Sequence, residues 1–227
     1  MALPIIIMLG GNEPKGYVTQ KLTTLLTIEP QPLLIAADLG AAYLLSHGLQ
    51  PDYLIGDADS LSTDIYNQLQ AGTTKVIRLT TDKDELDGAA AYDLARQLGA
   101  DDIHVFAAFS QMVDYTLANL LLPLANLEPA ISTFFYSDSF YARLIYQGTY
   151  HLTEPPGTRF SLLPLTAVSG LSLTGCRYPL HQATLPLGSS RCLSNQFQQN
   201  QVEISLQSGI MLLFVYISQI VGQEIEK

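Results

Sequence analysis

Carboxylate side chains directly follow one of the apolar segments in the first half of the sequence. Tyr53-Leu54-Ile55 is followed at once by Gly56 and by the motif Asp57-Ala58-Asp59-Ser60. Carboxylates are rarely buried unless they are paired or bound to a cation. Two of them placed immediately after a core segment could therefore serve as ligands of a metal ion.

Other acidic residues occupy similar positions. Asp38 follows the apolar segment 32–37, and the stretch TTDKDELD contains four acids, among them Asp84 and Asp87. Because these two are three residues apart, they can lie on one face of the first turn of a helix. Oxygen ligands from several loops, without histidine or cysteine, suit Mg²⁺ better than zinc.

Each acid taken alone also has a simpler explanation. Aspartate and glutamate favour the first turn of a helix through capping and the helix dipole, and Asp59-Ser60 fits an ordinary turn. This explanation weakens when several acids converge, because close carboxylates repel one another unless a cation offsets their charge. The sequence therefore favours a magnesium site over a set of unrelated caps.

The elements that must position these acids alternate along the first half. Apolar segments typical of strands cover residues 4–11, 32–38, 52–57, 75–79 and 102–108, and segments typical of helices cover 15–28, 41–48, 63–70, 85–98 and 115–124. This alternation predicts a doubly wound α/β domain, with a mostly parallel sheet and helices on both faces. Ligands of such sheets bind at the carboxyl ends of the strands, where the acids would meet.

The pattern changes after about residue 127. Short segments rich in β-branched and aromatic residues, separated by Gly, Pro and Ser, cover 131–136, 140–147, 159–165, 170–173, 202–207 and 210–217. These are typical of an all-β sandwich or barrel. We therefore expect an α/β domain over residues 1–128, which would carry the nucleotide and Mg²⁺, and a C-terminal β-sandwich domain over residues 129–227.

Composition excludes some classes of protein. The formal net charge of the 227 residues is −10, with 11 unclustered Lys and Arg, which argues against nucleic acid as the main partner. The late apolar run 210–221 is too short to span a bilayer, and the first residues resemble a strand rather than a secretion signal. We expect a cytoplasmic protein in which Cys176 and Cys192 are thiols, a disulfide being the alternative.

Several common motifs are absent. The sequence has no G-x-x-x-x-G-K-[ST] phosphate loop, no dinucleotide fingerprint and no G-x-S-x-G nucleophile motif, and its four histidines are scattered. Gly10-Gly11 ends the first expected strand, so its amides could approach a phosphate. Residue chemistry alone thus indicates a Mg²⁺-dependent phosphoryl-transfer or phosphate-binding protein.

The combination of motifs resembles the thiamine pyrophosphokinase family. The resemblance rests on GDADS, KDELD and DYTLANL in the first half and on RFSLLPLTAVSGLSLTGCRYPL, TLPLGSSRCLSNQF and VEISLQSGIMLLF in the second. It covers nearly the whole chain. It implies a homodimer with its site at the subunit interface, which transfers a pyrophosphoryl group from ATP to the hydroxyl of thiamine and releases AMP.

The resemblance also implies roles for individual residues. Asp57, Asp59 and Asp87 would be catalytic, and the same three with Asp84 would hold Mg²⁺. Asp38 and Asn119 would lie on the nucleotide side, and Ser190, Ser194 and Asn195 would form the polar loop that meets thiamine. Asp59 or Asp87 could accept the proton of the substrate hydroxyl, and the sequence leaves this choice open.

One segment departs from the family. Ser110-Gln111-Met112 stands where Gly-Gly-Arg is usual, and an arginine on a transferring phosphate can be worth roughly 10³-fold in rate. Three functions therefore remain open. The first is a working kinase in which Arg78, Lys83 or a cation of a partner subunit compensates. The second is a pyrophosphokinase for another heterocyclic alcohol, such as a hydroxymethylpterin. The third is a lapsed relative that binds thiamine or nucleotide without turnover.

Overall fold

The chain forms two compact units that divide between Asp138 and Ser139. The structure is a computed structural model, and it describes residues 3–56, 61–79, 86–125 and 128–217. None of the helices in these ranges has the length and apolar character that a membrane span requires.

The first unit is a parallel sheet with helices on both faces. Its strands are β1 (Pro4–Met8), β2 (Leu33–Ala37), β3 (Tyr53–Gly56), β4 (Lys75–Arg78), β5 (Asp102–Phe106) and β6 (Ser132–Tyr136). They lie in the order β6-β5-β1-β2-β3-β4, and every pair is parallel. Residues of β1 and β2 are apolar and almost all buried because helices cover both faces.

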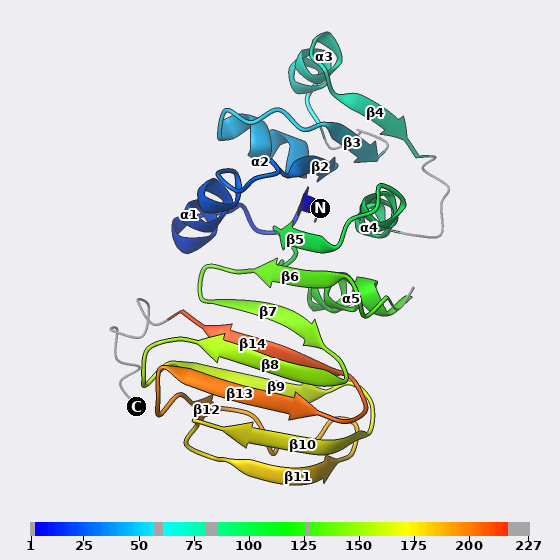
Figure 1. Cartoon of the computed structure of the whole chain (residues 1–227). Helices are drawn as coiled ribbons and strands as arrows, with labels where there is room; N and C mark the ends of the chain where they lie inside the picture. The colour runs from blue at the N-terminus through cyan, green and yellow to red at the C-terminus, as the bar shows by residue number, and fades with distance from the viewer. Residues whose placement is uncertain (1–2, 57–60, 80–85, 126–127, 218–227) are drawn as a thin grey trace. The chain divides into compact units, whose positions relative to one another are not determined.

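Within the described ranges, five helices connect these strands. They are α1 (Gly16–Leu25), α2 (Gly40–Ser46), α3 (Thr63–Ala71), α4 (Asp87–Gln97) and α5 (Val113–Ala125). Figure 1 shows α1 and α2 on one side of the sheet and α4 and α5 on the other. After β4 the chain crosses back and adds β5 along the edge of β1 that β2 does not occupy. Because crossovers between parallel strands are right-handed, strands added in this opposite direction have their connecting helices on the other face of the sheet.

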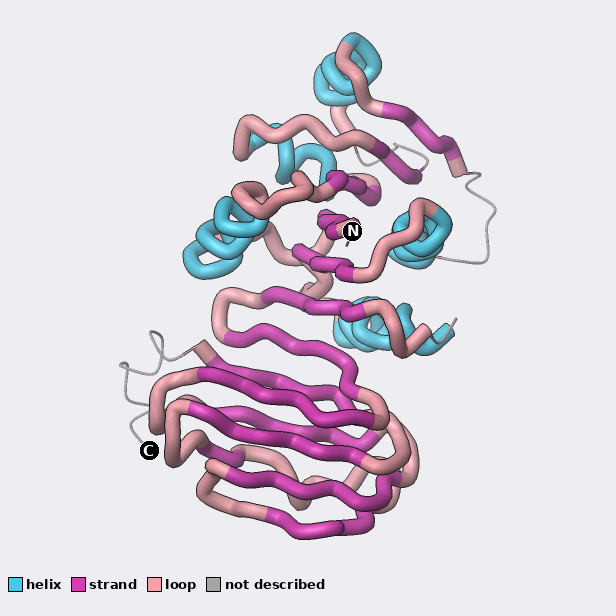
Figure 2. Tube along the Cα trace, viewed as in Figure 1, coloured by secondary structure: helices cyan, strands magenta, loops and turns pink. Residues whose placement is uncertain are grey.

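The second unit is a β-sandwich. One sheet has the order β12-β9-β14-β7 and the other β11-β10-β13-β8, with antiparallel pairing throughout. The strands, magenta in Figure 2, are β7 (Phe140–Ile145), β8 (Gly148–Thr153), β9 (Arg159–Pro164), β10 (Val168–Thr174), β11 (Leu180–Leu185), β12 (Asn195–Gln196), β13 (Gln201–Leu206) and β14 (Met211–Tyr216). Phe160 and Phe197 pack edge to face in its core, with ring centroids 5.4 Å apart.

The predicted fold class is confirmed, with two differences in detail. The division lies ten residues after the expected boundary at 128/129, because β6 pairs in parallel with β5 and so belongs to the first sheet. The sequence pattern also did not predict β8, β11 and β12. These three strands lie at the edges of their sheets, where exposed polar residues weaken the apolar alternation.

A buried hydrogen bond ties α4 to β6. The Tyr92 hydroxyl lies 2.9 Å from the Thr133 hydroxyl, and both residues are almost fully buried. Burial is also the main reason that the pKa of Tyr92 is raised. The pair therefore remains neutral and hydrogen-bonded, and it fixes the helix whose first residue is Asp87.

We expect Tyr92→Phe to lower the free energy of unfolding by about 1–2 kcal/mol, because the Thr133 hydroxyl loses its partner in the interior. Chemical denaturation of Tyr92→Phe, Thr133→Val and the double variant would measure the coupling. The double variant should be more stable than the sum of the single losses indicates, and strict additivity would contradict the bond. Tyr178→Phe, at an exposed tyrosine, is the matched control and should change little.

Candidate functional site

A cavity of about 330 Å³ lies at the carboxyl edge of the parallel sheet. It is lined by the chain at the ends of β1 and β2, by the segment after β5, by the start of α4 and by the first two turns of α5. The lining residues are 9–11, 37–39 and 86–88 with Ser110, Met112, Tyr115 and Asn119. The chain leaves β1 and β5 toward opposite faces of the sheet (Figure 1). Ligands of open α/β sheets bind at such a change of direction.

Backbone contacts fix the Gly10-Gly11 wall of this cavity. The Gly11 amide donates to the Ala107 carbonyl at 2.9 Å, and the Tyr43 hydroxyl donates to the Gly11 carbonyl at 2.9 Å. A Cβ at position 11 would lie only 2.3 Å from the Ala107 oxygen, so this close approach requires glycine. Burial, and then the charge of Glu13, raise the pKa of Tyr43, which keeps its hydroxyl protonated as a donor.

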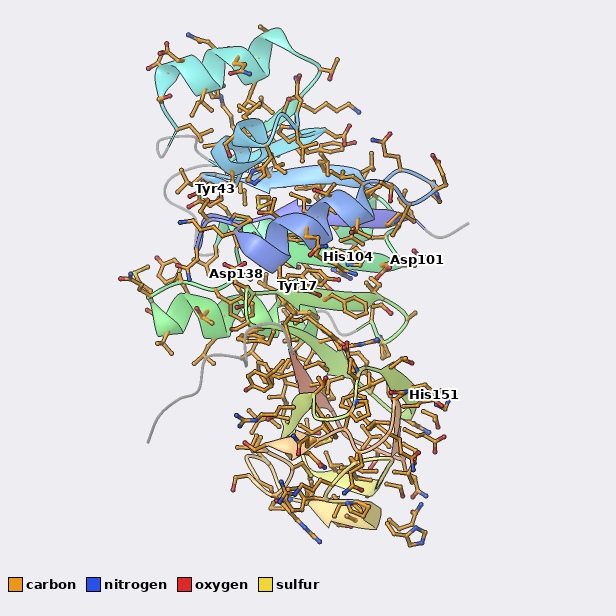
Figure 3. The ribbon with its side chains drawn as sticks, turned by 90° about the vertical axis from the view of Figure 1, so that its left-hand side faces the viewer. Tyr17, Tyr43, Asp101, His104, Asp138 and His151 are labelled. Atoms are coloured by element: carbon orange, nitrogen blue, oxygen red, sulfur yellow. The ribbon has the colours of Figure 1, made fainter. Side chains whose placement is uncertain are left out.

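Tyr43, labelled in Figure 3, is a supporting residue that sequence reasoning missed. It lies on α2, in a segment that the sequence marks only as helical. Its bond to Gly11 joins positions 32 residues apart. No local pattern carries that information, since the partner is a backbone carbonyl that any residue possesses.

Asp38 lines the cavity just after the end of β2. It has a positive φ of 45°, a region that aspartate tolerates better than most residues, and its amide donates to the Ile55 carbonyl at 3.1 Å. Its Oδ1 atom is shielded from solvent and lies against Gly56, where a Cβ would be only 1.9 Å away. The carboxylate is thereby turned toward the end of β3, the strand that Asp57 and Asp59 follow in sequence.

Asp87 is the first residue of α4 and lines the same cavity. It is half-buried, and its Oδ1 atom is shielded from solvent. Its position in the first turn also complements the helix dipole, so the simpler explanation of this acid and a ligand role are compatible. Asp38 and Asp87 thus reach one cavity from two separate elements.

The other predicted metal ligands, Asp57, Asp59 and Asp84, lie outside the described residues. Within the described ranges there is no group of three or more His, Cys, Asp or Glu residues that could hold a metal ion. The metal set therefore stays a prediction, and Asp87 is its one member among the described residues, with Asp38 lining the same cavity.

Asn119 lines the cavity from α5 and is 9% exposed. Its Nδ2 donates to the Ala108 carbonyl at 2.9 Å, while its Oδ1 lies close to Gly88 in the first turn of α4. The side chain therefore holds the segment after β5 and contacts α4 at the same time. The sequence predicted Asn119 at the nucleotide side, and the structure places it at the cavity that Asp38 and Asp87 share.

The segment Ser110-Gln111-Met112, which stands in place of Gly-Gly-Arg, is held by hydrogen bonds between its own residues. The Ser110 hydroxyl donates to the Met112 carbonyl at 3.0 Å and accepts from the Met112 amide at 3.1 Å, and the Ser110 amide donates to the Thr116 hydroxyl at 3.0 Å. Met112 is 52% exposed and lines the cavity. No lysine or arginine occurs among the described residues of the lining.

Of the two cations of this chain that the sequence suggested as a replacement, only Arg78 is among the described residues, and it does not line the cavity. Arg78 donates to the Tyr66 hydroxyl, with 3.2 Å between Nε and the oxygen, and its guanidinium lies 5.5 Å from the centre of the Tyr66 ring. It is therefore engaged at the end of β4. Lys83 lies outside the described residues.

The residues predicted to meet thiamine lie in the loop before β12 and at the first residue of that strand. Ser190 is exposed, and the Ser194 hydroxyl accepts from Arg159 at 3.0 Å. Asn195 is 2% exposed. Its side-chain Nδ2 donates to the Tyr178 carbonyl, and its Oδ1 accepts from the Tyr178 amide. The Asn195 side chain therefore supports the loop, and contact of these residues with thiamine remains a prediction.

Two models of known protein families match this chain. The model of the thiamin pyrophosphokinase catalytic domain matches residues 25–135, and the model of the thiamin pyrophosphokinase vitamin B1 binding domain matches residues 149–211. The chain belongs to the thiamin pyrophosphokinase family. The family resemblance predicted from the motifs is thereby confirmed.

Individual relatives cover nearly the whole chain. The thiamine pyrophosphokinase of Bacillus subtilis (strain 168) is 26% identical over 183 residues, which are 80% of this chain and 86% of the relative. The crystal structure of thiamine pyrophosphokinase from B. subtilis is similar with a TM-score of 0.83 at 24% identity, over 95% of this chain and 99% of that one. The corresponding enzyme from Geobacillus thermodenitrificans has a TM-score of 0.80 at 25% identity, over 96% and 99%.

We expect Asn119→Asp to lower the free energy of unfolding by about 1–3 kcal/mol, because a carboxylate cannot donate to the Ala108 carbonyl and both would be acceptors in a buried place. Thermal and urea unfolding at neutral pH would measure the loss. Asn67→Asp, the same change at an exposed position of α3, should have little effect. Equal stability of the two variants would contradict the supporting role of Asn119.

Proposed function

We propose that the protein is a working thiamine pyrophosphokinase, which transfers a pyrophosphoryl group from ATP to the hydroxyl of thiamine and gives thiamine diphosphate and AMP. The observation that carries this proposal is the cavity shared by Asp38, Asp87 and Asn119. It lies at the carboxyl edge of the parallel sheet, and these three residues fall within the segment that the catalytic-domain model matches. The vitamin B1 binding model matches the unit that follows.

A magnesium ion fits the donors at this cavity. Asp38 and Asp87 offer carboxylate oxygens, and the Asp38 carboxylate lies against Gly56, next in sequence to Asp57. We propose Asp57, Asp59, Asp84 and Asp87 as the magnesium ligands. Bound Mg²⁺ would neutralise the charge of the phosphate oxygens during transfer.

The residues of the chain supply positioning. Gly10-Gly11 offers a wall without side chains, held by Tyr43 and Ala107, against which a phosphate can come close to the backbone. Asn119 keeps the opposite loop in place through Ala108. Asp87 or Asp59 would accept the proton of the thiamine hydroxyl as its oxygen attacks the β-phosphorus and AMP leaves.

A homodimer is supported by the surface of α5. Val113, Leu117 and Leu121 are spaced by four residues, so they share one face of the helix, and they are 67%, 53% and 39% exposed. Met112 and Tyr115 extend this apolar surface to the cavity. We propose that a second copy covers it and contributes to the site, including the cation that Met112 does not supply.

The proposal also places the reaction in the cytoplasm. ATP is its second substrate, and the buried thiols Cys176 and Cys192 are both free, which suits a reducing compartment. A cytoplasmic location is therefore consistent with the substrate pair and with the state of the cysteines.

The direct test incubates the purified protein with ATP, thiamine and Mg²⁺ and measures AMP and thiamine diphosphate by chromatography. We expect the two products in equal amounts. Asp87→Asn should lower kcat by about 10²-fold or more, because it removes a carboxylate from the site. Asp64→Asn, the same change in the first turn of α3, should leave kcat unchanged.

Two results would contradict this proposal. A near-normal rate in Asp87→Asn would remove that residue from the catalytic set. An absence of AMP from the wild-type protein, with thiamine still binding in calorimetry, would identify a binder without turnover and would point to the Ser110–Met112 segment as the cause.

We expect Leu117→Glu to dissociate the dimer, because a charge would be placed in the centre of a covered apolar face. Light scattering coupled to size exclusion would measure the mass, and activity should fall with it. Ile28→Glu introduces the same charge at another exposed aliphatic residue and should leave the mass unchanged. A wild-type protein of monomer mass would overturn the dimer proposal.

A further inference from the structure

The parallel sheet of the first unit has one strand with an open side. β4 is the last strand in the order β6-β5-β1-β2-β3-β4, and among the described residues no segment pairs with its outer edge (Figure 1). The Lys75 amide donates toward β3, to the Asp52 carbonyl at 2.8 Å. Because alternate residues of a strand direct their backbone groups to opposite sides, those of Val76 and Arg78 face the open edge. Such an edge can accept a further strand.

The side chains of β4 alternate between the two faces of the sheet. Lys75 and Ile77 lie on one face, and Val76 and Arg78 lie on the other. The two aliphatic residues are half-buried, whereas the two cations at the ends of the strand are exposed. Each face of the edge therefore offers one apolar side chain and one positive charge.

A tyrosine lies against each of these cations. Lys75 Nζ is 5.2 Å from the centre of the ring of Tyr53, the residue of β3 with which Lys75 pairs. The Arg78 guanidinium is 5.5 Å from the centre of the Tyr66 ring on α3 and also donates to the Tyr66 hydroxyl. These contacts restrain two long side chains, so both charges are held beside the strand.

The charges of Lys75 and Arg78 are not offset within the described part of the chain. There the two side chains contact tyrosines, and neither forms an ion pair with a carboxylate. Arg96 of the same unit differs, since it pairs with Asp93 and Glu128. Two charges on a strand of four residues therefore remain available to a partner.

The charges disfavour a second copy of this chain as that partner. If two β4 strands paired antiparallel over all four residues, Lys75 of one copy would lie opposite Arg78 of the other. Like charges in that position are destabilising, and lysine on an edge strand opposes self-pairing for this reason. An acidic partner reverses the sign of the same interaction.

We propose that the open edge of β4 binds an extended acidic segment of another protein, which adds a strand to the sheet. Acidic residues of the segment would lie opposite Lys75 and Arg78, and two apolar residues between them would lie opposite Val76 and Ile77. This pattern is symmetric, so it fits either strand direction. Because the contact is small, binding is weak and reversible. The inference does not rest on the proposed kinase activity.

The test titrates the full-length, ¹⁵N-labelled protein with the peptide acetyl-TEVVET-amide and follows backbone amides by NMR. We expect saturable shifts at residues 75–78 and slower hydrogen exchange of the Val76 and Arg78 amides, which would gain acceptors. Lys75→Glu should weaken binding about tenfold or more, because a like charge replaces an opposite one. Lys15→Glu makes the same change at another exposed lysine of this unit and should leave the affinity unchanged.

Two further peptides distinguish strand addition from simple attraction between charges. Each is the same peptide N-methylated at alternate residues, so each lacks the N–H groups of one side. One of the two should lose its affinity and the other should keep it, because only one side of an added strand faces β4.

Four results would overturn the proposal. They are equal affinity of the two methylated peptides, equally tight binding of the basic peptide acetyl-TKVVKT-amide, shifts confined to other residues, and an equal effect of the Lys15 control. Shifts at residues 75–78 that depend on protein concentration without peptide would identify a second copy as the occupant and would overturn it too. A dispersed spectrum would show that Lys75→Glu is folded, and Lys75→Gln would replace it if it is not.

Discussion

The parallel pairing of β1 with β5 is the constraint on which the catalytic unit depends. Met8 pairs with Phe106 at the end of this pair, and beyond it Gly11 packs so closely against Ala107 that no side chain would fit. The chain then leaves β1 and β5 toward opposite faces of the sheet. The space that opens between the two loops is the cavity, and its Gly10-Gly11 wall is held by the hydrogen bonds from Gly11 to Ala107 and from Tyr43 to Gly11.

The two units differ in the balance of acidic and basic residues. Residues 1–138 contain 17 of the 21 acids and six of the 11 basic residues, so the unit with the cavity at the sheet edge is strongly acidic. Carboxylates and phosphates repel one another unless a cation lies between them, and this is the reason for proposing magnesium at the cavity that Asp38 and Asp87 share. The described part of the second unit has four arginines and two glutamates, so its charge has the opposite sign.

Asn195 matches a motif that suggested ligand binding, but its side chain has a structural role. Its motif suggested a contact with the vitamin, yet both ends of its amide are bonded to the backbone of Tyr178. Asn119 in the first unit is similar, since its amide holds Ala108 while the residue lines the cavity. In both places a buried amide fixes a loop, because an amide can satisfy a donor and an acceptor of the backbone at once.

The sequence by itself determined the alternation of strands and helices, the later change to β structure, and the placement of acids after strand ends. These follow from local periodicity and residue type, which need no knowledge of distant segments. Only the tertiary structure decided that β6 joins the first sheet, that Tyr43 holds Gly11, and that Lys75 lies over the ring of Tyr53. Each of these depends on a partner far away in the chain, and strand pairing and backbone carbonyls leave no mark in the local pattern.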